Sequence, residues 1–220
     1  MAFAFVLPAS RPLLDTAGSQ DAHPVDADRA ASALRADYER WSRWGLGLLT
    51  FFLTALGLLV AVGMVGTIAM LGGVPAVLDV VVIVVAAAVA SAGVAVLVVL
   101  WRSGRRMLRA ASWWMRLPYT HGGRQRRAAG WLQARTVNFE PRVFARITTA
   151  TLALLLGIAG VSLLIRDLVT EWTSVTAAFG AIGVLALVSG SVQFGGVLRL
   201  VSALSEADPL WVRIRSAFRG

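Results

Sequence analysis

The chain has 220 residues, of which 57% are hydrophobic and 15% are charged, and its formal net charge is +9. Soluble domains are about one-quarter charged, so this composition is typical of a membrane protein and excludes an ordinary soluble domain. The sequence has no cysteine, which excludes disulfides, thiolate catalysis and cysteine-ligated metal sites.

The N-terminal region divides at residue 25. Residues 1–25 contain three prolines among serine, glycine and aspartate, so we expect a disordered tail. In residues 26–44 the apolar side chains recur at helical spacing, and Glu39 and Arg43 lie one turn apart. This pattern predicts an amphipathic helix before the first apolar run. Its apolar positions are Ala31, Leu34, Tyr38, Trp41 and Trp44.

Four uncharged apolar runs follow. A helix rises about 1.5 Å per residue, so about 20 apolar residues cross the hydrocarbon core of a bilayer, and each run is long enough. Strands of a membrane barrel need only about 10 alternating residues and are excluded. We therefore predict an all-α polytopic membrane protein, a four-transmembrane-helix bundle with hairpins in residues 26–101 and 147–204. The runs are Leu46–Leu71, Val80–Trp101, Ile147–Ile165 and Trp172–Leu198.

The connection between the second and third runs is strongly basic. Residues 102–146 hold eleven arginines and one acid, Glu140. Because Lys and Arg near span ends stay in the cytoplasm, we expect this loop inside, and four spans then place both termini inside. Seven of the eight tryptophans fall on the same side. The predicted location is the cell (cytoplasmic or inner) membrane. All basic residues are arginine, which favours a GC-rich bacterial source because lysine codons are rich in A.

Three segments on the expected cytoplasmic side carry arginine on one helical face and apolar or aromatic residues on the other. They are residues 26–44, residues 102–117 and the C-terminal tail, 205–220. Such helices lie on anionic headgroups, so we predict amphipathic interfacial helices. The predicted partners are the lipid bilayer, anionic lipid headgroups, and a protein partner or a second copy of the chain. The candidate lipid- or partner-binding residues are Arg102, Arg105, Arg106, Arg109, Trp113, Trp114, Arg124, Arg126 and Arg127.

Asp79 and Gln193 are candidates for an ion or proton site, because polar groups inside a span are usually functional. Asp79 follows Pro75 about one turn inside the outer end of its apolar stretch, in the first turn of its helix, where the helix dipole stabilises an acid. We favour this structural role, with a proton or cation site and an ion pair to Arg166 as alternatives. Gln193 lies in the fourth run, and we expect it to bond a neighbouring helix.

Small residues recur at four-residue spacing in the spans. In lipid, such residues let helix backbones approach closely, either inside the bundle or, on the fourth span, between copies of the chain. A shift of the chain by 103 residues also places Arg43 on Arg146 and Gly57 on Gly160, which suggests a duplicated hairpin. The small-residue pairs are Gly57 with Ala61, Ala153 with Gly157, Ala186 with Gly190, and Ser191 with Gly195.

The sequence holds no catalytic signature. His23 and His121 have no partners at ligand spacing, and the HExxH, GxSxG and phosphate-loop motifs are absent. We expect no enzyme, no cofactor, no metal site and no nucleic-acid partner. One hypothesis is an accessory or scaffold subunit that binds a partner or anionic lipid through residues 102–146. The alternative is a small oligomeric channel or transporter using the third and fourth spans, which is less favoured because few polar groups lie at mid-depth.

Overall fold

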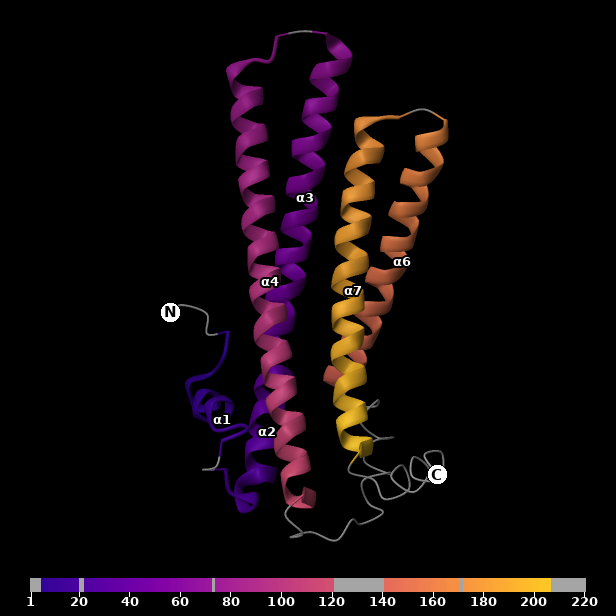
Figure 1. Ribbon diagram of the computed structural model, residues 1–220. Helices are drawn as coiled ribbons and strands as arrows, with labels where there is room; N and C mark the ends of the chain where they lie inside the picture. The colour runs from indigo at the N-terminus through magenta and orange to yellow at the C-terminus, as the bar shows by residue number, and fades with distance from the viewer. Residues whose placement is uncertain (1–4, 20–21, 73, 121–140, 171, 207–220) are drawn as a thin grey trace. The chain divides into compact units, whose positions relative to one another are not determined.

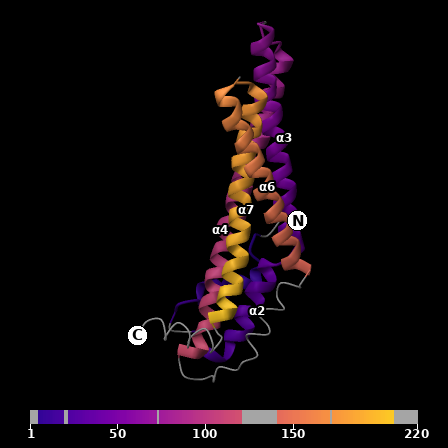
Figure 2. The same ribbon diagram turned by 90° about the vertical axis from the view of Figure 1, so that its right-hand side faces the viewer.

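The computed structural model describes residues 5–19, 22–72, 74–120, 141–170 and 172–206, and their regular structure is helical throughout. Each of the four longest helices is long and apolar enough to cross a membrane, as predicted. These helices, drawn in Figures 1 and 2, are α3 (Trp41–Leu71), α4 (Val77–Thr120), α6 (Pro141–Val169) and α7 (Ser174–Glu206). Shorter helices precede them: η1 (Pro8–Ser10), α1 (Arg11–Asp15), η2 (Pro24–Asp26) and α2 (Ala27–Tyr38).

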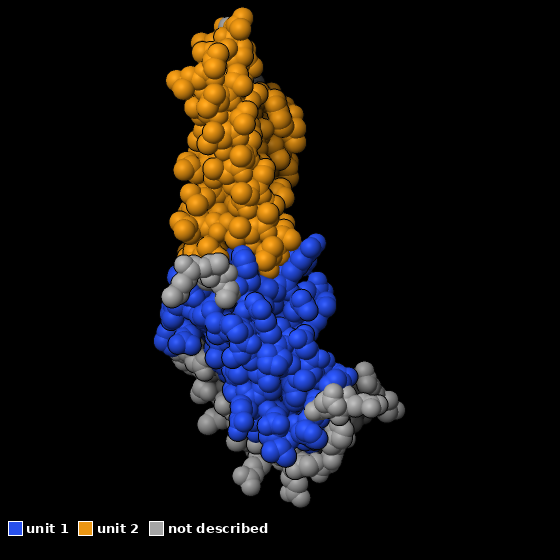
Figure 3. All heavy atoms as spheres, turned by 90° about the vertical axis from the view of Figure 1, so that its left-hand side faces the viewer, with its two compact units in different colours: residues 1–44, 100–147, 194–220 blue, residues 45–99, 148–193 orange. Residues whose placement is uncertain are grey.

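The chain divides into two compact units, coloured separately in Figure 3. Unit 1 comprises residues 1–44, 100–147 and 194–220, and it includes the N-terminal helices and the basic part of α4. Unit 2 comprises residues 45–99 and 148–193. The four apolar runs predicted from the sequence lie almost entirely in unit 2.

In unit 2, α3 and α4 approach closely because glycines occupy their contact. A Cβ atom on Gly57 would lie 2.7 Å from the carbonyl oxygen of Ala86 and 3.1 Å from the amide nitrogen of Ala90. About one turn away, a Cβ atom on Gly93 would overlap the side chain of the fully buried Thr54. The Thr54 hydroxyl bonds a carbonyl of its own helix, so no polar group is left unsatisfied there.

In the second hairpin, α7 contacts α6 through small residues. A Cβ atom on Gly160 would lie 2.7 Å from the carbonyl oxygen of Phe179, and one on Gly183 would lie 2.9 Å from the amide nitrogen of Val161. Neither glycine can be enlarged without separating the two backbones. Contact of this kind supplies the dispersion energy that replaces the hydrophobic effect between helices in lipid.

The packing role predicted for the small residues is confirmed at Gly57, Gly157 and Gly190, where an added Cβ would meet a neighbouring helix. The pair Ser191 and Gly195 differs, because Ser191 is exposed and an added Cβ on Gly195 would meet no atom within 4 Å. The interface between copies of the chain that the sequence predicts on the fourth span stays a prediction.

The positions of the two turns contradict a gapless duplication of the hairpin. The first hairpin turns at residues 72–76, where Gly72 takes a φ of 62°, the left-handed conformation that ends many helices. The second turns between Val169 and Ser174. A shift of 103 residues would map the first turn onto residues 175–179, which lie inside α7.

Unit 1 has its own hydrophobic core, formed mainly between α2 and the later part of α4. The apolar face predicted for residues 102–117 packs within this core, and so do Ala31, Leu34 and Tyr38 of the face predicted for residues 26–44, whereas Trp41 is exposed. Burial of apolar surface is favourable by about 25 cal/mol per Å², and here protein supplies the apolar partner. The interfacial placement of these two helices is therefore corrected. The core residues are Ala27, Ala30, Ala31, Leu34, Tyr38, Met107, Leu108, Ala110, Ala111, Trp114, Leu117, Val143 and Val197.

The structure also differs from the disordered tail expected at residues 1–25, since Leu13, Leu14, Ala17 and Ala22 of this segment pack against the core of unit 1. The backbone amide of Leu7 donates a hydrogen bond to a carboxylate oxygen of Asp37 at 2.9 Å. The indole of Trp114 donates one to the carbonyl oxygen of Leu13 at 3.0 Å. The prolines that suggested disorder stand in the first turns of η1, α1 and η2, where a missing N–H costs no hydrogen bond.

Candidate functional site

The part of α4 that belongs to unit 1 has two opposite faces. One face is buried in the core described above, whereas the other carries exposed arginines with the half-buried Trp113 among them. These arginines are three, four or seven residues apart, which keeps them on one side of the helix. We call them the basic stripe: Arg102, Arg106, Arg109 and Arg116.

The neighbouring tryptophans of α4 have different environments. Trp114 is 2% exposed, and its indole N–H donates a hydrogen bond to the carbonyl oxygen of Leu13, so Trp114 is a core residue. Trp113 is half-buried, and its ring meets that of Trp114 edge to face with centroids 5.1 Å apart. The prediction that both bind lipid or a partner is therefore corrected for Trp114, while Trp113 remains beside the basic stripe.

Arg105 stands apart from the basic stripe. It is half-buried, and its guanidinium carbon lies 5.7 Å from the ring centroid of Trp101. A cation over an aromatic face is attracted by the ring quadrupole, by about 0.5–1 kcal/mol at exposed sites. Arg105 thus has a partner within its own helix, and we leave it out of the surface offered to a ligand.

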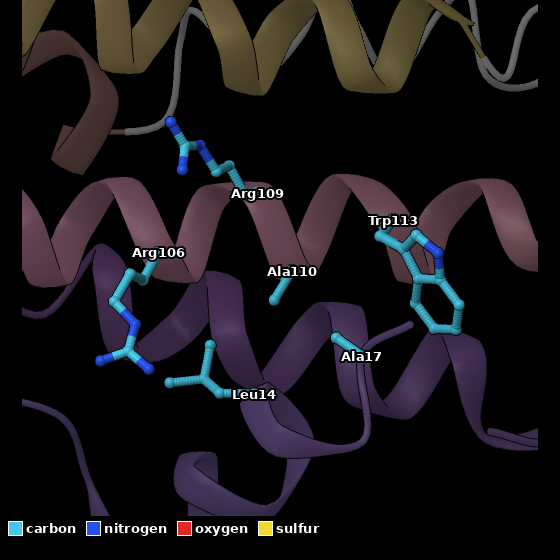
Figure 4. Close-up of a pocket in the computed structure, with 6 residues that line it drawn as sticks. All are labelled: Leu14, Ala17, Arg106, Arg109, Ala110 and Trp113. Carbon is cyan, nitrogen blue, oxygen red and sulfur yellow. The ribbon is translucent and has the colours of Figure 1, made fainter. Parts of the chain in front are cut away.

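A shallow hollow of about 330 Å³, open to the surface and called the cavity below, lies between α4 and the N-terminal segment. Leu14 of α1 and the following Ala17 form one wall, and α4 supplies the rest. In Figure 4 the Arg106 side chain extends to the side of α4 on which Leu14 and Ala17 lie, whereas the Arg109 side chain extends to the other side, and the Trp113 indole lies farther along the helix. The cavity therefore combines apolar walls with two cations from the basic stripe.

Arg43, which the sequence places near the membrane surface, is 5% exposed. Its guanidinium donates hydrogen bonds to the carbonyl oxygen of Phe5 at 2.6 Å, to the hydroxyl of Ser103 at 2.7 Å, and to the carbonyl oxygen of Leu100. Arg43 thereby joins the start of α3 to the N-terminal segment and to α4. Charge-assisted bonds to carbonyl groups offset part of the cost of removing the cation from water.

Arg146 is likewise buried, at 8% exposure, and it contacts Tyr38 at the end of α2. The Tyr38 ring also contacts Gly104, and its hydroxyl contacts Gly196. One tyrosine thus touches α4, α6 and α7. Sequence reasoning missed both buried arginines, because the positive-inside rule explains such residues without giving them a contact. The one signal was the alignment of Arg43 with Arg146 in the 103-residue shift.

Two acids are buried near these arginines. Asp37 is 2% exposed, and its carboxylate accepts a hydrogen bond from the backbone amide of Leu7. The other carboxylate oxygen of Asp37 lies 3.9 Å from Nε of Arg40. Glu39 is 6% exposed and accepts a hydrogen bond from Arg35 at 2.7 Å. Glu39 forms its ion pair with Arg35, four residues earlier in the sequence. The predicted contact between Glu39 and Arg43 would need the helix to continue past Tyr38, where α2 ends.

Asp79 and Gln193 both have partners within unit 2. A carboxylate oxygen of Asp79 accepts the backbone amide of Ala76 at 3.0 Å, a capping contact across the first turn of α4. This contact agrees with the helix-start role favoured for Asp79, while Arg166 pairs with its neighbour Asp167 at 2.8 Å. The amide oxygen of Gln193 accepts the hydroxyl of Thr149 at 3.2 Å, which confirms the predicted bond to a neighbouring helix.

Three predicted site residues, Arg124, Arg126 and Arg127, and the C-terminal residues 207–220 lie outside the described residues. Within the described residues, no group of three His, Cys, Asp or Glu is placed to hold a metal ion. Compared with protein-family models, curated proteins and solved structures, the chain matches none.

Proposed function

We propose that the chain is a non-enzymatic accessory subunit of the cell membrane that holds an acidic protein partner on the basic stripe of α4. In this proposal four helices cross the membrane, and unit 1 lies in the cytoplasm with both termini. The observation that carries it is the placement of Arg102, Arg106 and Arg109 on the face of α4 opposite the buried core. Their exposure makes these cations accessible to a ligand from outside the chain.

The length of α4 favours a protein partner over lipid headgroups. The second apolar run ends at Trp101, and a headgroup layer is roughly 5–8 Å thick. At about 1.5 Å per residue, Arg109 lies roughly 12 Å and Arg116 roughly 22 Å farther along the helix axis. Arg102 can therefore bind headgroups, whereas the later arginines extend past that layer to where a soluble acidic surface would dock.

A structural role for the polar residues of the spans supports an accessory subunit over a channel. The carboxylate of Asp79 caps the start of α4, and Gln193 bonds Thr149. Both candidate ion-site residues thus have a role in holding the helices. The sequence also offers no catalytic motif, which supports a non-enzymatic function.

Recovery of a partner from the source cells with the tagged full-length protein tests this proposal. Changing Arg102, Arg106 and Arg109 together to Gln should reduce recovery about tenfold, because exposed ion pairs contribute roughly 0.2–1 kcal/mol each. Recovery by the unchanged protein should also fall as salt rises.

A matched control changes three exposed arginines that lie outside α4, Arg11, Arg29 and Arg142, to Gln. This variant loses the same net charge and should recover the partner normally. Equal losses in the two variants would show that net charge matters and the stripe does not, and would overturn the proposal.

A further inference from the structure

The cavity beside the basic stripe has features that the charge of the stripe does not explain. Its walls include the apolar side chains of Leu14, Ala17 and Ala110, and the indole of Trp113 lies at one end. Its volume of about 330 Å³ lies at the lower limit of ligand sites, which are roughly 300–1,000 Å³. A purely electrostatic contact needs no such hollow, so the cavity suits an apolar group that arrives next to negative charge.

From this geometry we infer that the cavity binds one apolar side chain from an acidic segment of the partner. Carboxylates of that segment, on either side of the apolar side chain, pair with Arg106 and Arg109. This inference rests on the proposed function and specifies what the stripe recognises. Arginine pairs with carboxylates in a planar, two-pronged geometry. Figure 4 shows the two guanidinium groups on opposite sides of α4, so they can hold acids on either side of one anchor.

A peptide fits this position better than the acyl chain of a bilayer lipid. Ala110 lies nine residues beyond Trp101, which is roughly 14 Å along the axis of α4. The headgroup layer extends only roughly 5–8 Å, so a lipid would have to leave the bilayer to reach the cavity. An apolar anchor within a charged rim is also the usual arrangement of a protein interface.

The test uses the full chain in nanodiscs of neutral phosphatidylcholine and a fluorescein-labelled peptide with one leucine flanked by glutamates. Two control peptides replace the leucine by serine or the glutamates by glutamine. Burial of a leucine side chain predicts that the leucine peptide binds about tenfold more tightly than the serine peptide. The glutamine peptide should bind weakly and without salt dependence.

The variant Ala17→Leu fills the cavity without altering any charge, and Ala17→Ser leaves it open. Ala17→Leu should reduce binding of the leucine peptide to the level of the serine peptide, and Ala17→Ser should leave the tenfold difference intact. If circular dichroism shows that Ala17→Leu disturbs the fold, Trp113→Ala replaces it, because this change removes one wall of the cavity. Trp113→Ala should weaken binding of the leucine peptide to the level of the serine peptide and leave binding of the serine peptide unchanged.

The outcomes separate this inference from the proposed function. Equal binding of the leucine and serine peptides, both dependent on salt and on Arg106 and Arg109, would overturn the cavity inference and leave the acidic partner in place. Failure of both acidic peptides to bind would count against the proposed function as well. Displacement of the leucine peptide by phosphatidylglycerol vesicles, but not by phosphatidylcholine vesicles, would assign the cavity to a lipid and overturn the inference.

Discussion

The guanidinium of Arg146 lies over the ring of Tyr38, 4.7 Å from its centroid, and donates a hydrogen bond to the carbonyl oxygen of the same residue at 2.8 Å. This pair ties the start of α6 to the end of α2, two segments more than 100 residues apart in the sequence. The contact holds together the unit that carries the basic stripe. The ring and the carbonyl oxygen of Tyr38 also offset part of the free energy that is needed to remove the Arg146 cation from water.

We expect Arg146→Gln to destabilise unit 1 by about 2 kcal/mol, because a hydrogen bond to a charged group contributes roughly 1.5–3 kcal/mol and the cation–π contact is lost too. Thermal unfolding in mild detergent, followed by tryptophan fluorescence, measures this change. Arg142→Gln, about one turn earlier on the exposed surface of α6, is the control and should stay within about 0.5 kcal/mol of the unchanged protein. Similar losses in the two variants would contradict the role of the Tyr38 contact.

The neighbouring tryptophans of α4 give a second prediction. Trp114→Ala should destabilise unit 1 by roughly 3–5 kcal/mol, because it empties a core position and leaves the carbonyl oxygen of Leu13 without its donor. Trp113→Ala should cost much less stability and instead weaken binding at the cavity. The two variants are compared in the same unfolding experiment. Equal destabilisation would mean that Trp113 belongs to the core as much as Trp114.

Helix number and type could be predicted from the sequence because the length of an apolar run directly limits what it can form. What covers an amphipathic face could not. Helical spacing shows that Leu34 and Met107 lie on apolar faces, but lipid and a second helix satisfy such faces equally well. Adjacent residues such as Trp113 and Trp114 differ by only about 100° around a helix, so the edge of a buried face is difficult to locate from spacing alone.

The basic stripe was partly predictable, since three of its four arginines, Arg102, Arg106 and Arg109, were singled out by charge and Arg116 was not. The buried arginines were not, because a cation near a span end is expected to extend toward water. Arg43 instead meets three polar groups supplied by distant segments of the chain. Such long-range contacts depend on how the N-terminal residues fold back, and the prolines there were interpreted as signs of disorder.

The proposed orientation predicts the behaviour of fused reporters. Because eleven of twelve charged residues in the segment 102–146 are arginine, a reporter active only outside the cell should be silent after Gly122. The same reporter should be active after Gly73. Enzymatic activity on each side of the membrane, normalised to the amount of fusion protein, is the measurement. The opposite pattern would place unit 1 outside and remove the cytoplasmic partner from the proposal.

A flux assay tests the channel alternative. We expect the purified protein in liposomes to conduct no protons or cations, and therefore Asp79→Asn and Gln193→Leu to change nothing in that assay. Asp79→Ala should lower stability by about 1 kcal/mol through loss of the cap, whereas Asp79→Asn keeps an acceptor oxygen. Flux driven by a proton gradient, measured for the unchanged protein and for Asp79→Asn, distinguishes a channel from an accessory subunit. A clear flux that this change removes would overturn the accessory proposal.

The glycines of the second hairpin separate packing inside the chain from association between chains. Gly160→Leu should disrupt the contact of α6 with α7, because its side chain would meet the backbone of Phe179 and Gly183. Gly195→Leu, by contrast, faces open space and should leave the fold of one copy intact.

Light scattering with chromatography in detergent then reports the oligomeric state of each variant. If Ser191 and Gly195 form an interface between copies, Gly195→Leu should yield monomers of unchanged thermal stability. An unchanged oligomer would exclude this face as the interface, and an unfolded Gly195→Leu monomer would contradict the open environment of that glycine.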